Sequence, residues 1–546
     1  MAKIQTALGL LLSYQISCLP AAAQAFQDLS TTADGSVLYF SSPVRQKGTD
    51  QKFYSKIFRW TAAEGVKLAA EVRDPGTPDT CGPSRFYQLN RPQVSADGAV
   101  FGYTASRPVE INRYCSPAEA NQGIIGQLGR TTRLDGNVAL SPNGRYAITT
   151  TFVGLADDFH TVTDLSSGVS TIVAGAFNGS SRRVTNDGAI LTPKSSAVIV
   201  TDRTGQTRVL PAKRTVDDAI IDAAGAKVVY VTYLGPNSTA RLSVISVQTG
   251  NETELTTGFT ILNPLITADA STLFFRDVAD TRLQLFTVGI GGSNRRQITN
   301  ERDGIAIAVV SGNGLVAFAV TSSSRLLRID VASGVATELV PATPLITASY
   351  RVFRPQTTIA AVGSLIDLYG SSLASVRQLI FCGRPADLLP DLAQRYMRFQ
   401  VPWDLPEGPC QVIVTSDSPF EHGIDLQVRQ YDPRFVDYGA GVGLLYHGDF
   451  DSDISQANPA SAGEVIVAYM TGLGPVDNNG LVSAGFQCRF DVTPVEVLYA
   501  GLAPQFLGFY QANIRVPVLG SVDLAPSLSC GWDVTRQAAT RVWLKN

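Results

Sequence analysis

Short apolar runs with alternating polar positions fill the first 340 residues of the chain, and tight polar turns separate them. The repeating unit is clearest in the strand-like runs 265–267, 272–276, 283–288 and 296–299. Alternation with a period of two residues predicts β-strands, and Asp-Gly or Asn-Gly tolerates the positive φ of a tight hairpin. This part of the chain is therefore predicted to be built from short antiparallel strands.

The same turn signal occurs seven times, each time followed at once by an apolar, β-branched or aromatic run. After a longer first interval, the turns recur about every 40–45 residues, which is the period of a β-propeller blade. Seven turns predict a seven-bladed propeller over residues 26–340. Six blades is the alternative, because the fourth repeat is short and the second has a poor third strand. The turns are Thr32-Ala33-Asp34-Gly35, Ser95-Ala96-Asp97-Gly98, Ser141-Pro142-Asn143-Gly144, Thr185-Asn186-Asp187-Gly188, Asp222-Ala223-Ala224-Gly225, Thr267-Ala268-Asp269-Ala270 and Ser311-Gly312-Asn313-Gly314.

The repeat also predicts which face of the propeller carries recognition. In a four-stranded blade, the turns after the first and third strands lie on one face, and the other connections lie on the opposite face. Two long insertions, 71–91 and 107–122, belong to the second kind. Elaborated loops on a rigid scaffold are where binding usually resides. We therefore expect a contact patch formed by Arg73, Tyr87, Asn90, Arg107, Glu110, Arg113 and Tyr114. The alternative is that the insertions are merely stiffened by a disulfide.

Beyond residues 341–345, a linker rich in proline, the strand pattern changes and no helical period appears. Strand-like runs at 364–370, 411–415 and 424–428, with a cysteine pair about 30 residues apart, suggest an immunoglobulin-like sandwich. We expect one β-sandwich at 346–430 and a second sandwich module at 431–546.

The N-terminus has the features of a secretory signal peptide over residues 1–25. Lys3 provides the positive charge, residues 7–19 are mostly apolar, and Ala23-Gln24-Ala25 is a cleavage motif that would start the mature chain at Phe26. An N-terminal core helix, or a lipoprotein anchored through Cys18, are the alternatives. No later stretch reaches 18 apolar residues, so no transmembrane segment is expected after processing, and we expect a secreted or periplasmic protein.

Six cysteines remain after the signal, an even number that an oxidising compartment would pair. Six cysteines allow 15 connectivities, among which order along the chain favours Cys81–Cys115, Cys382–Cys410 and Cys488–Cys530. A metal site is disfavoured, because there is no Cys-x-x-Cys and the three histidines lie far from any cysteine in sequence.

Composition narrows the function without naming it. Charged residues make up 17% of the chain and the net charge is −3, with no basic cluster, which argues against nucleic-acid binding. His160, His422 and His447 lie in different contexts, so a Ser-His-Asp triad is not expected, and each is predicted to be a surface or hydrogen-bonding residue.

One acidic loop has the alternating carboxylates of a Ca²⁺ site, at Asp449, Asp451 and Asp453. It lacks the glycine and distal glutamate of an EF-hand, which favours a solvated acidic loop and no cofactor. Paired acids for glycoside cleavage around a propeller channel stay open, because spacing in a repeat protein does not reveal which carboxylates converge.

Two resemblances add to this interpretation. The Ala-Asp-Gly turns followed by hydrophobic strands resemble the WD40-like repeats of the TolB-like propellers. Five blocks in the last third resemble a C-terminal domain family of large secreted acidobacterial proteins, itself similar to IPT/TIG-type sandwiches. This family implies a surface or secretion-related accessory role and carries no established chemistry. The blocks are 363–374, 399–408, 458–460, 465–476 and 499–517.

Together these features predict a secreted, non-enzymatic binding or scaffold protein whose propeller recognises a protein or glycan partner. The alternatives are a propeller hydrolase or lyase acting on extracellular polysaccharide, and a structural module of a cell-surface assembly.

Overall fold

The computed structural model describes residues 24–545 except 52, 72–87, 112–113, 128–129, 152–158, 175–182, 233–238, 352–356, 390–395, 438–441, 451, 505, 519–524 and 534. Two compact units result, one of Gln24–Thr343 with Ser418–Phe420 and one of Pro344–Asp417 with Glu421–Asn546. Regular structure is almost entirely β-strand, apart from the 3-10 turn η3 (Leu373–Ser375). In the part of the chain that is described, no helix has the length and apolar character needed to cross a membrane.

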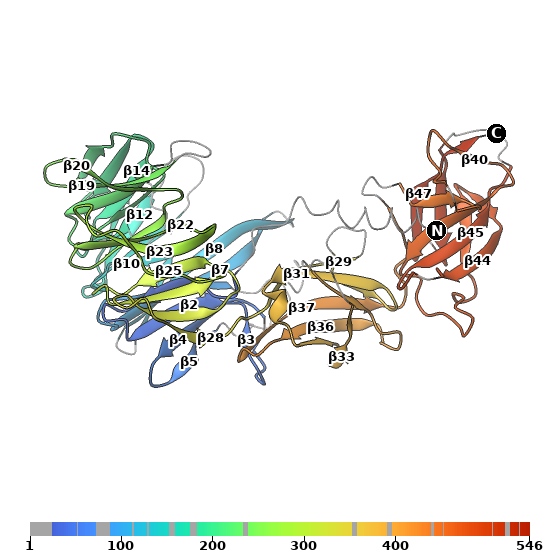
Figure 1. Cartoon of the computed structure of the whole chain (residues 1–546), viewed down its shortest axis with the longest axis horizontal. Helices are drawn as coiled ribbons and strands as arrows, with labels where there is room; N and C mark the ends of the chain where they lie inside the picture. The colour runs from blue at the N-terminus through green and yellow to red at the C-terminus, as the bar shows by residue number, and fades with distance from the viewer. Residues whose placement is uncertain are drawn as a thin grey trace. The chain divides into compact units, whose positions relative to one another are not determined.

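Seven antiparallel sheets form the first unit, which confirms the all-β propeller and its seven blades (Figure 1). Blades one to three are β1 (Gln27–Thr31), β2 (Val37–Ser42), β4 (Lys56–Thr61) and β5 (Gly65–Ala70); β6 (Gln88–Val94), β7 (Val100–Ile111), β8 (Tyr114–Gln127) and β9 (Arg130–Asp135); and β10 (Asn137–Leu140), β11 (Tyr146–Thr151), β12 (Phe159–Asp164) and β13 (Ser170–Ala174). A two-residue strand, β3 (Arg45–Gln46), follows β2 and precedes β4 along the chain and is not part of the sheet of blade one.

The remaining blades follow the same order along the chain. They are β14 (Ile190–Lys194), β15 (Ala197–Thr201) and β16 (Thr207–Pro211); β17 (Asp218–Ile221), β18 (Lys227–Thr232), β19 (Ala240–Ser246) and β20 (Glu252–Gly258); β21 (Leu262–Ile266), β22 (Thr272–Ala279), β23 (Arg282–Gly289) and β24 (Arg296–Gln297); and β25 (Ile305–Val310), β26 (Val316–Thr321), β27 (Leu326–Asp330) and β28 (Ala336–Val340). The short fourth repeat is a three-stranded sheet, whose innermost position contributes only an isolated bridge from Val184 to Ile190.

Blade seven meets blade one without sharing a strand with it. Each of these blades is formed by one contiguous stretch of the chain, and β1 lies beside both β6 and β25. The Trp60 ring of blade one meets the Phe318 ring of blade seven edge-on, with 5.4 Å between centroids. The circle is therefore closed by side-chain packing and by hydrogen bonds between turns, because no common sheet joins the two blades.

The seven turns are hydrogen-bonded to one another around the circle. The second residue of a turn donates its backbone N–H to a carbonyl of the neighbouring turn at four of the seven junctions. The backbone N–H of Asn313, the third residue of its turn, and the side chains of Asn143 and Lys227 complete the other three. The bonds are Ala33 N to Ala96 O (2.9 Å), Ala96 N to Pro142 O (2.8 Å), Asn143 Nδ2 to Asn186 O (2.9 Å), Asn186 N to Ala223 O (2.8 Å), Lys227 Nζ to Ala270 O (3.1 Å), Ala268 N to Gly312 O (2.8 Å) and Asn313 N to Ala33 O (2.8 Å). Every junction between blades thus carries at least one hydrogen bond on this face.

Each turn is also bonded within itself, as turn 95–98 shows. Ser95 Oγ donates to Asp97 Oδ1 (2.6 Å) and accepts from the N–H of Val100 (2.9 Å). The same carboxylate oxygen accepts from the N–H of Ala99 (3.0 Å). Blade five departs from this pattern: Asp222 stands in the hydroxyl position and accepts from the N–H groups of Ala226 and Lys227 itself. The fourth residue of every turn is left-handed, with φ of 70–82° at the glycines and 53° at Ala270.

The second unit contains two β-sandwiches. In the first, one sheet is β29 (Leu345–Arg351), β31 (Leu365–Ser371), β35 (Met397–Gln400) and β34 (Leu388–Leu389); the other is β37 (Phe420–Arg429), β36 (Gly408–Thr415), β32 (Gln378–Phe381) and β33 (Arg384–Ala386), with β30 (Ile359–Ala361) parallel to β37. Buried aromatic and aliphatic side chains fill the space between the sheets, including Phe381 and Phe399 with centroids 5.1 Å apart.

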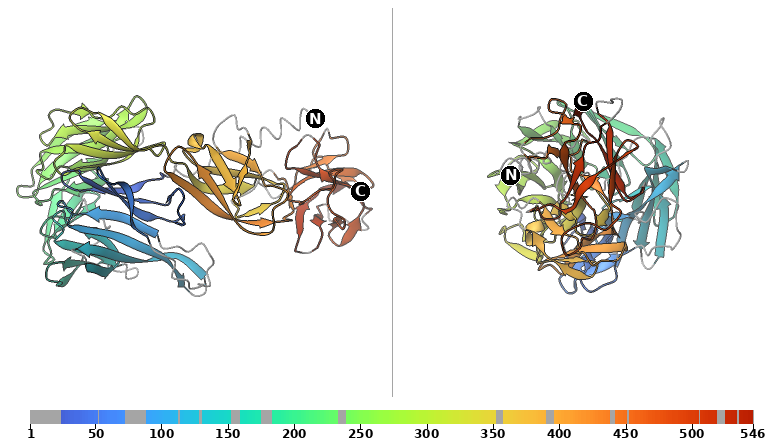
Figure 2. Two further views of the ribbon diagram at one scale, coloured as in Figure 1. Left: turned by 90° about the horizontal axis from the view of Figure 1, so that it is seen from below. Right: turned by 90° about the vertical axis from the view of Figure 1, so that its right-hand side faces the viewer.

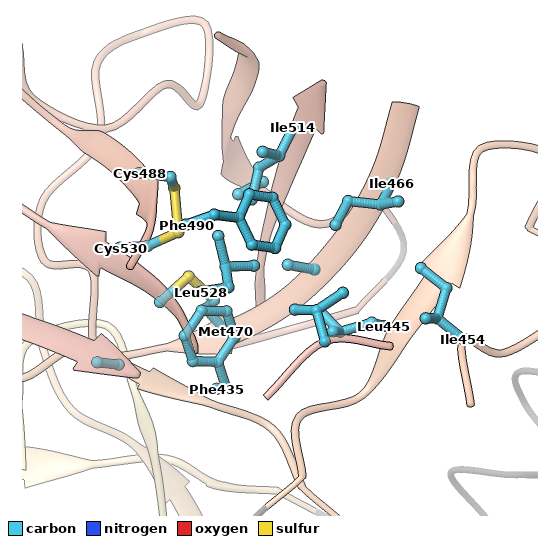
Figure 3. Packing of buried hydrophobic residues seen from close by; sticks show 14 of the residues in the cluster. Phe435, Leu445, Ile454, Ile466, Met470, Cys488, Phe490, Ile514, Leu528 and Cys530 are labelled. Carbon is cyan, nitrogen blue, oxygen red and sulfur yellow. A yellow bond between two sulfur atoms is a disulfide. The ribbon is translucent and has the colours of Figure 1, made fainter. Parts of the chain in front are cut away.

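In the second sandwich, one sheet is β38 (Arg434–Phe435), β41 (Val465–Thr471), β45 (Tyr510–Arg515) and β44 (Val497–Leu502), with β39 (Leu445–His447) on β41; the other is β43 (Thr493–Val495), β42 (Gln487–Phe490), β46 (Ser527–Gly531) and β47 (Gln537–Arg541). The strands β40 (Ala460–Ser461) and β48 (Leu544–Lys545) form a separate pair. Phe435, Met470, Phe490 and Leu528 pack together in the core, beside the Cys488–Cys530 bond (Figure 3).

Two of the three expected disulfides are confirmed, Cys382–Cys410 and Cys488–Cys530. Cys488 and Cys530 are direct partners on β42 and β46, with Cα atoms 4.1 Å apart. The third expected pair includes Cys81, which lies outside the described residues.

Protonating the turn carboxylates should weaken the propeller at low pH. The hydroxyl of Ser95 and the N–H of Ala99 lower the pKa of Asp97 below its ordinary 3.8, and similar bonds lower the pKa of Asp34 and Asp269. A lowered pKa gives stability that is present above pH 3.8 and is lost as pH falls through the folded value. The melting temperature measured between pH 5 and pH 2 should fall less steeply for Asp97→Asn than for the wild type. Asparagine already occupies this position in the turns at 143 and 313. An equally steep fall would contradict the assignment.

Removing the buried disulfide should destabilise the second sandwich. The bond closes a 42-residue separation, and both cysteines are buried in the core. Cys488→Ala/Cys530→Ala should lower the unfolding free energy by about 2–4 kcal/mol, measured by denaturant titration of the full chain. Reduction of the wild type, which also breaks Cys382–Cys410, should give at least as large a loss.

Candidate functional site

The innermost strands of the blades enclose a central channel with a cavity volume of about 640 Å³. Its wall exposes polar and apolar groups to similar extents, with Leu140, Ile220, Leu265 and Val309 among the aliphatic lining residues. At the turn end, small residues crowd together: a Cβ on Gly312 would lie 3.1 Å from the Cβ of Ala33. At this end the channel therefore presents mainly small and apolar groups.

The opposite mouth of the channel is polar. Innermost strands begin at this mouth and end in the turns. Asp28 and Asn263 line the mouth near the start of β1 and β21, and Arg91 lines it in the middle of β6. All three residues are left-handed, with φ of 49°, 51° and 49°. Each coincides with a register shift between its strand and the next strand of the same blade. A bulge re-aims side chains locally, and here it occurs at equivalent positions of three blades.

Hydrogen bonds hold these bulges in place. Asp28 Oδ2 accepts from Ser41 Oγ (2.8 Å) and from the backbone N–H of Arg91 (3.1 Å), which links blade one to blade two. Asn263 Oδ1 accepts from Arg276 Nη2 (3.1 Å), and Arg276 Nη1 donates to the carbonyl of Ile305 in blade seven. The mouth thus presents a carboxylate, a guanidinium and an amide on a fixed backbone. Asp28 and Arg91 are the only charged side chains among the channel-lining residues that the structure describes.

Gln93 connects the channel walls of blades two and three. Its Nε2 donates to the carbonyl of Val138 (2.8 Å), and its Oε1 accepts from the N–H of Leu140 (2.6 Å). Ser30 Oγ accepts from the N–H of Val94 (3.1 Å) in the same way between blades one and two. These side chains satisfy backbone groups of adjacent innermost strands, which do not pair with one another as a sheet.

A long β-ribbon leaves the propeller on the same face as the mouth. β7 and β8 have 12 and 14 residues, whereas the other strands of the propeller have two to eight. The pairing of β6 with β7 starts at Ser106, and that of β8 with β9 starts at Gln122, so the two strands continue beyond these points as a pair. Figure 1 and Figure 2 show this ribbon in light blue, reaching past the rest of blade two. The expected loop insertion at 107–122 is therefore wrong in its described part, where both strands of the hairpin simply lengthen.

The predicted patch residues divide between the ribbon and other positions. Arg107, Glu110 and Tyr114 lie on the ribbon, where Glu110 is opposite Cys115 and Tyr114 is opposite Ile111. Asn90 lies in β6, and its Nδ2 donates to Ser106 Oγ (3.3 Å). Arg73, Tyr87 and Arg113 lie outside the described residues, so their place in the patch stays a prediction.

Neither histidine chemistry nor a metal site emerges from the rest of the described chain. His160 and His422 are buried in β12 and β37, and His422 Nδ1 accepts from the N–H of Ile346 (3.2 Å). His447 Nδ1 is hydrogen-bonded to Glu464 Oε1. Asp449 and Asp453 are exposed, Asp451 lies outside the described residues, and no group of three metal-ligating side chains occurs in the part of the chain that the structure describes.

Sequence reasoning missed the mouth residues. Asp28, Arg91 and Asn263 carry no shared motif, since their left-handed conformation comes from the register with the neighbouring strand. The three residues do occupy equivalent positions of their repeats. This equivalence can be recognised only after the bulges have been located in the structure.

Comparison with known proteins gives similarities of fold. No protein-family model matches the sequence, and no curated protein matches it. TolB from Acinetobacter baumannii is 16% identical with a TM-score of 0.32, over 48% of this chain and 63% of TolB. An oligogalacturonate lyase in complex with manganese is 12% identical with a TM-score of 0.39, over 55% of this chain and 87% of the lyase. The β-propeller domain of the trilobed protease from Pyrococcus furiosus is 10% identical with a TM-score of 0.41, over 58% of this chain and 98% of that domain. The chain thus spans less than two thirds of TolB.

Replacing Gln93 should destabilise the propeller. Gln93→Leu removes the partners of two backbone groups, the carbonyl of Val138 and the N–H of Leu140, at a residue that is 6% exposed. We expect a loss of about 1–3 kcal/mol, measured by denaturant titration. Gln206→Leu, at an exposed turn of blade four, is the control and should stay within about 0.5 kcal/mol of the wild type. Equal stabilities for the two variants would contradict the role of Gln93.

Proposed function

We propose that the propeller is a binding platform for a protein partner, which contacts the polar mouth and the β7–β8 ribbon. The observation that carries this proposal is the presence of three polar residues in left-handed bulges at one mouth of the channel. The ribbon extends from the same face. A partner seated there would meet fixed polar groups at the mouth and aliphatic side chains in the wall below them.

Backbone conformation supports a role beyond folding. A non-glycine residue at positive φ costs of order 1–3 kcal/mol, and such residues concentrate at functional sites. Asparagine and aspartate tolerate this conformation best, whereas arginine gains nothing from it. Arg91 has φ 51° and an exposed side chain at the mouth. We propose that the charge and the planar donors of Arg91 contact the partner.

The chemistry of the channel favours a protein over a polysaccharide. Glycans pack their C–H faces on aromatic rings, and no aromatic side chain is among the lining residues that the structure describes. The aliphatic side chains of the wall suit an apolar side chain of a protein segment, while Asp28, Arg91 and Asn263 can bind its polar backbone groups.

The same lining bears on the enzymatic alternative. A glycoside hydrolase needs two carboxylates, about 5–10 Å apart, on either side of the scissile bond. Asp28 is the one carboxylate among the described lining residues, and it already accepts two hydrogen bonds. This supports binding as the principal role.

We infer that the chain acts outside the cytoplasm. Two disulfides are present, and disulfides persist in oxidising compartments. The leader-like N-terminus predicts export, and the resemblance of five blocks to a secreted-protein domain family suggests an accessory role for the sandwiches.

Variants of the mouth and ribbon test the proposal. The double variant Asp28→Asn/Arg91→Asn removes both charges and keeps residues that tolerate positive φ. A second variant, Arg107→Ser/Glu110→Ser/Tyr114→Ser, alters the ribbon. Each should weaken binding of a partner captured by crosslinking at the cell surface by at least about tenfold, or about 1.4 kcal/mol, in a titration with the purified partner.

The control is Val335→Thr, at an exposed turn between β27 and β28 on the opposite face, which should leave binding unchanged. Unchanged binding by both test variants would overturn the placement of the site. Binding to a glycan array that the mouth variant abolishes would replace the protein partner with a glycan, and release of sugar products would favour the enzyme.

A further inference from the structure

The first described residues form part of the closure between blades seven and one. Ala25 and Phe26 are 0% exposed. The N–H of Ala25 donates to Ser324 Oγ (3.1 Å) in blade seven, and the carbonyl of Ala25 accepts from Ser42 Oγ (2.5 Å) in blade one. Residue 25 therefore uses both backbone groups to connect the two blades that share no strand.

Gln24 adds to this closure. Its Oε1 accepts from Ser324 Oγ (3.2 Å), and its carbonyl accepts from Gln27 Nε2 (3.0 Å). Its side chain is half-buried, whereas the next two residues are buried. The segment thus passes from the surface to the interior of the propeller between Gln24 and Ala25.

A leader cut after Ala25 is at odds with this structure. The cut would place the new ammonium group on Phe26, which is buried against Phe40 with centroids 5.5 Å apart. An ammonium group without a partner is unfavourable in such surroundings. Ser42 Oγ would also lose its acceptor, and Ser324 Oγ would lose both of its partners.

We propose that the mature protein begins at Gln24, because the leader is removed by hydrolysis of the Ala23–Gln24 bond. Ala21 and Ala23 supply the two small residues that a signal peptidase requires, three positions and one position before the cut. This cut lies two residues upstream of the cut expected from the motif 23–25. Water adds across the peptide bond, so the carboxylate leaves on Ala23 and the amine remains on Gln24. Because cleavage precedes folding, the structure does not direct the cut itself. It requires that the processed chain keep Gln24 and Ala25, since only such a chain can form the closure. The proposal rests on the leader predicted from the sequence.

Two experiments test the parts separately. The first is intact-mass analysis and N-terminal sequencing of the exported full-length protein. A start at Gln24 is expected, including a form that has lost ammonia after the α-amine attacks the side-chain amide carbon. A start at Phe26, another start, or a retained leader would overturn the processing site.

The second experiment tests the closure without export. Two chains, beginning at Gln24 and at Phe26 after proteolytic removal of a fusion partner, are compared as purified proteins with and without Ser324→Gly. Glycine removes the hydroxyl and suits φ 55° at this position. The chain that begins at Gln24 should melt at least about 2 °C above the chain that begins at Phe26, and Ser324→Gly should lower the melting temperature of the longer chain more than that of the shorter one. Equal melting temperatures, or equal effects of Ser324→Gly in both chains, would overturn the closure while leaving the partner-binding face untouched.

Discussion

Closure of the circle between blades seven and one is the constraint on which the propeller depends. Every other junction joins blades that follow one another along the chain, but this junction must form between segments about 300 residues apart. No strand is shared across it, so its stability comes from Trp60 against Phe318, from Asn313 N to Ala33 O, and from the bonds of Ala25. Loop-closure entropy opposes this contact, and three separate sets of interactions offset it.

The two ends of the channel follow from how the blades are held together. On the turn face, neighbouring turns approach closely enough for direct backbone hydrogen bonds, which demands small residues such as Ala33 and Gly312. On the other face, bulges place polar side chains at the mouth of the channel, and the lengthened β7–β8 pair extends from the same face. Bonds between blades occur on this face as well, from Arg91 N to Asp28 and through Ala25.

Sequence reasoning predicted what depends on local chemistry. A turn of the type Ser95-Ala96-Asp97-Gly98 can be recognised in the sequence. The hydroxyl and the carboxylate form hydrogen bonds within the turn, and the glycine adopts the positive φ that the turn needs. The disulfide partners Cys488 and Cys530 also followed from their order along the chain. Register is different: the bulge at Arg91 and the continuation of β7 past Ser106 depend on what the neighbouring strand does. Gln93 reads as an ordinary strand residue, although it bridges two blades.

The contiguity of each blade has a consequence for how such a chain can change. Because each blade is formed by one contiguous stretch of the chain, it is a self-contained cassette whose strands pair only with one another. A cassette can be duplicated, or the order rotated so that another blade comes first, without re-pairing any strand. Velcro-type rings, in which one terminus completes the other's sheet, lack this freedom.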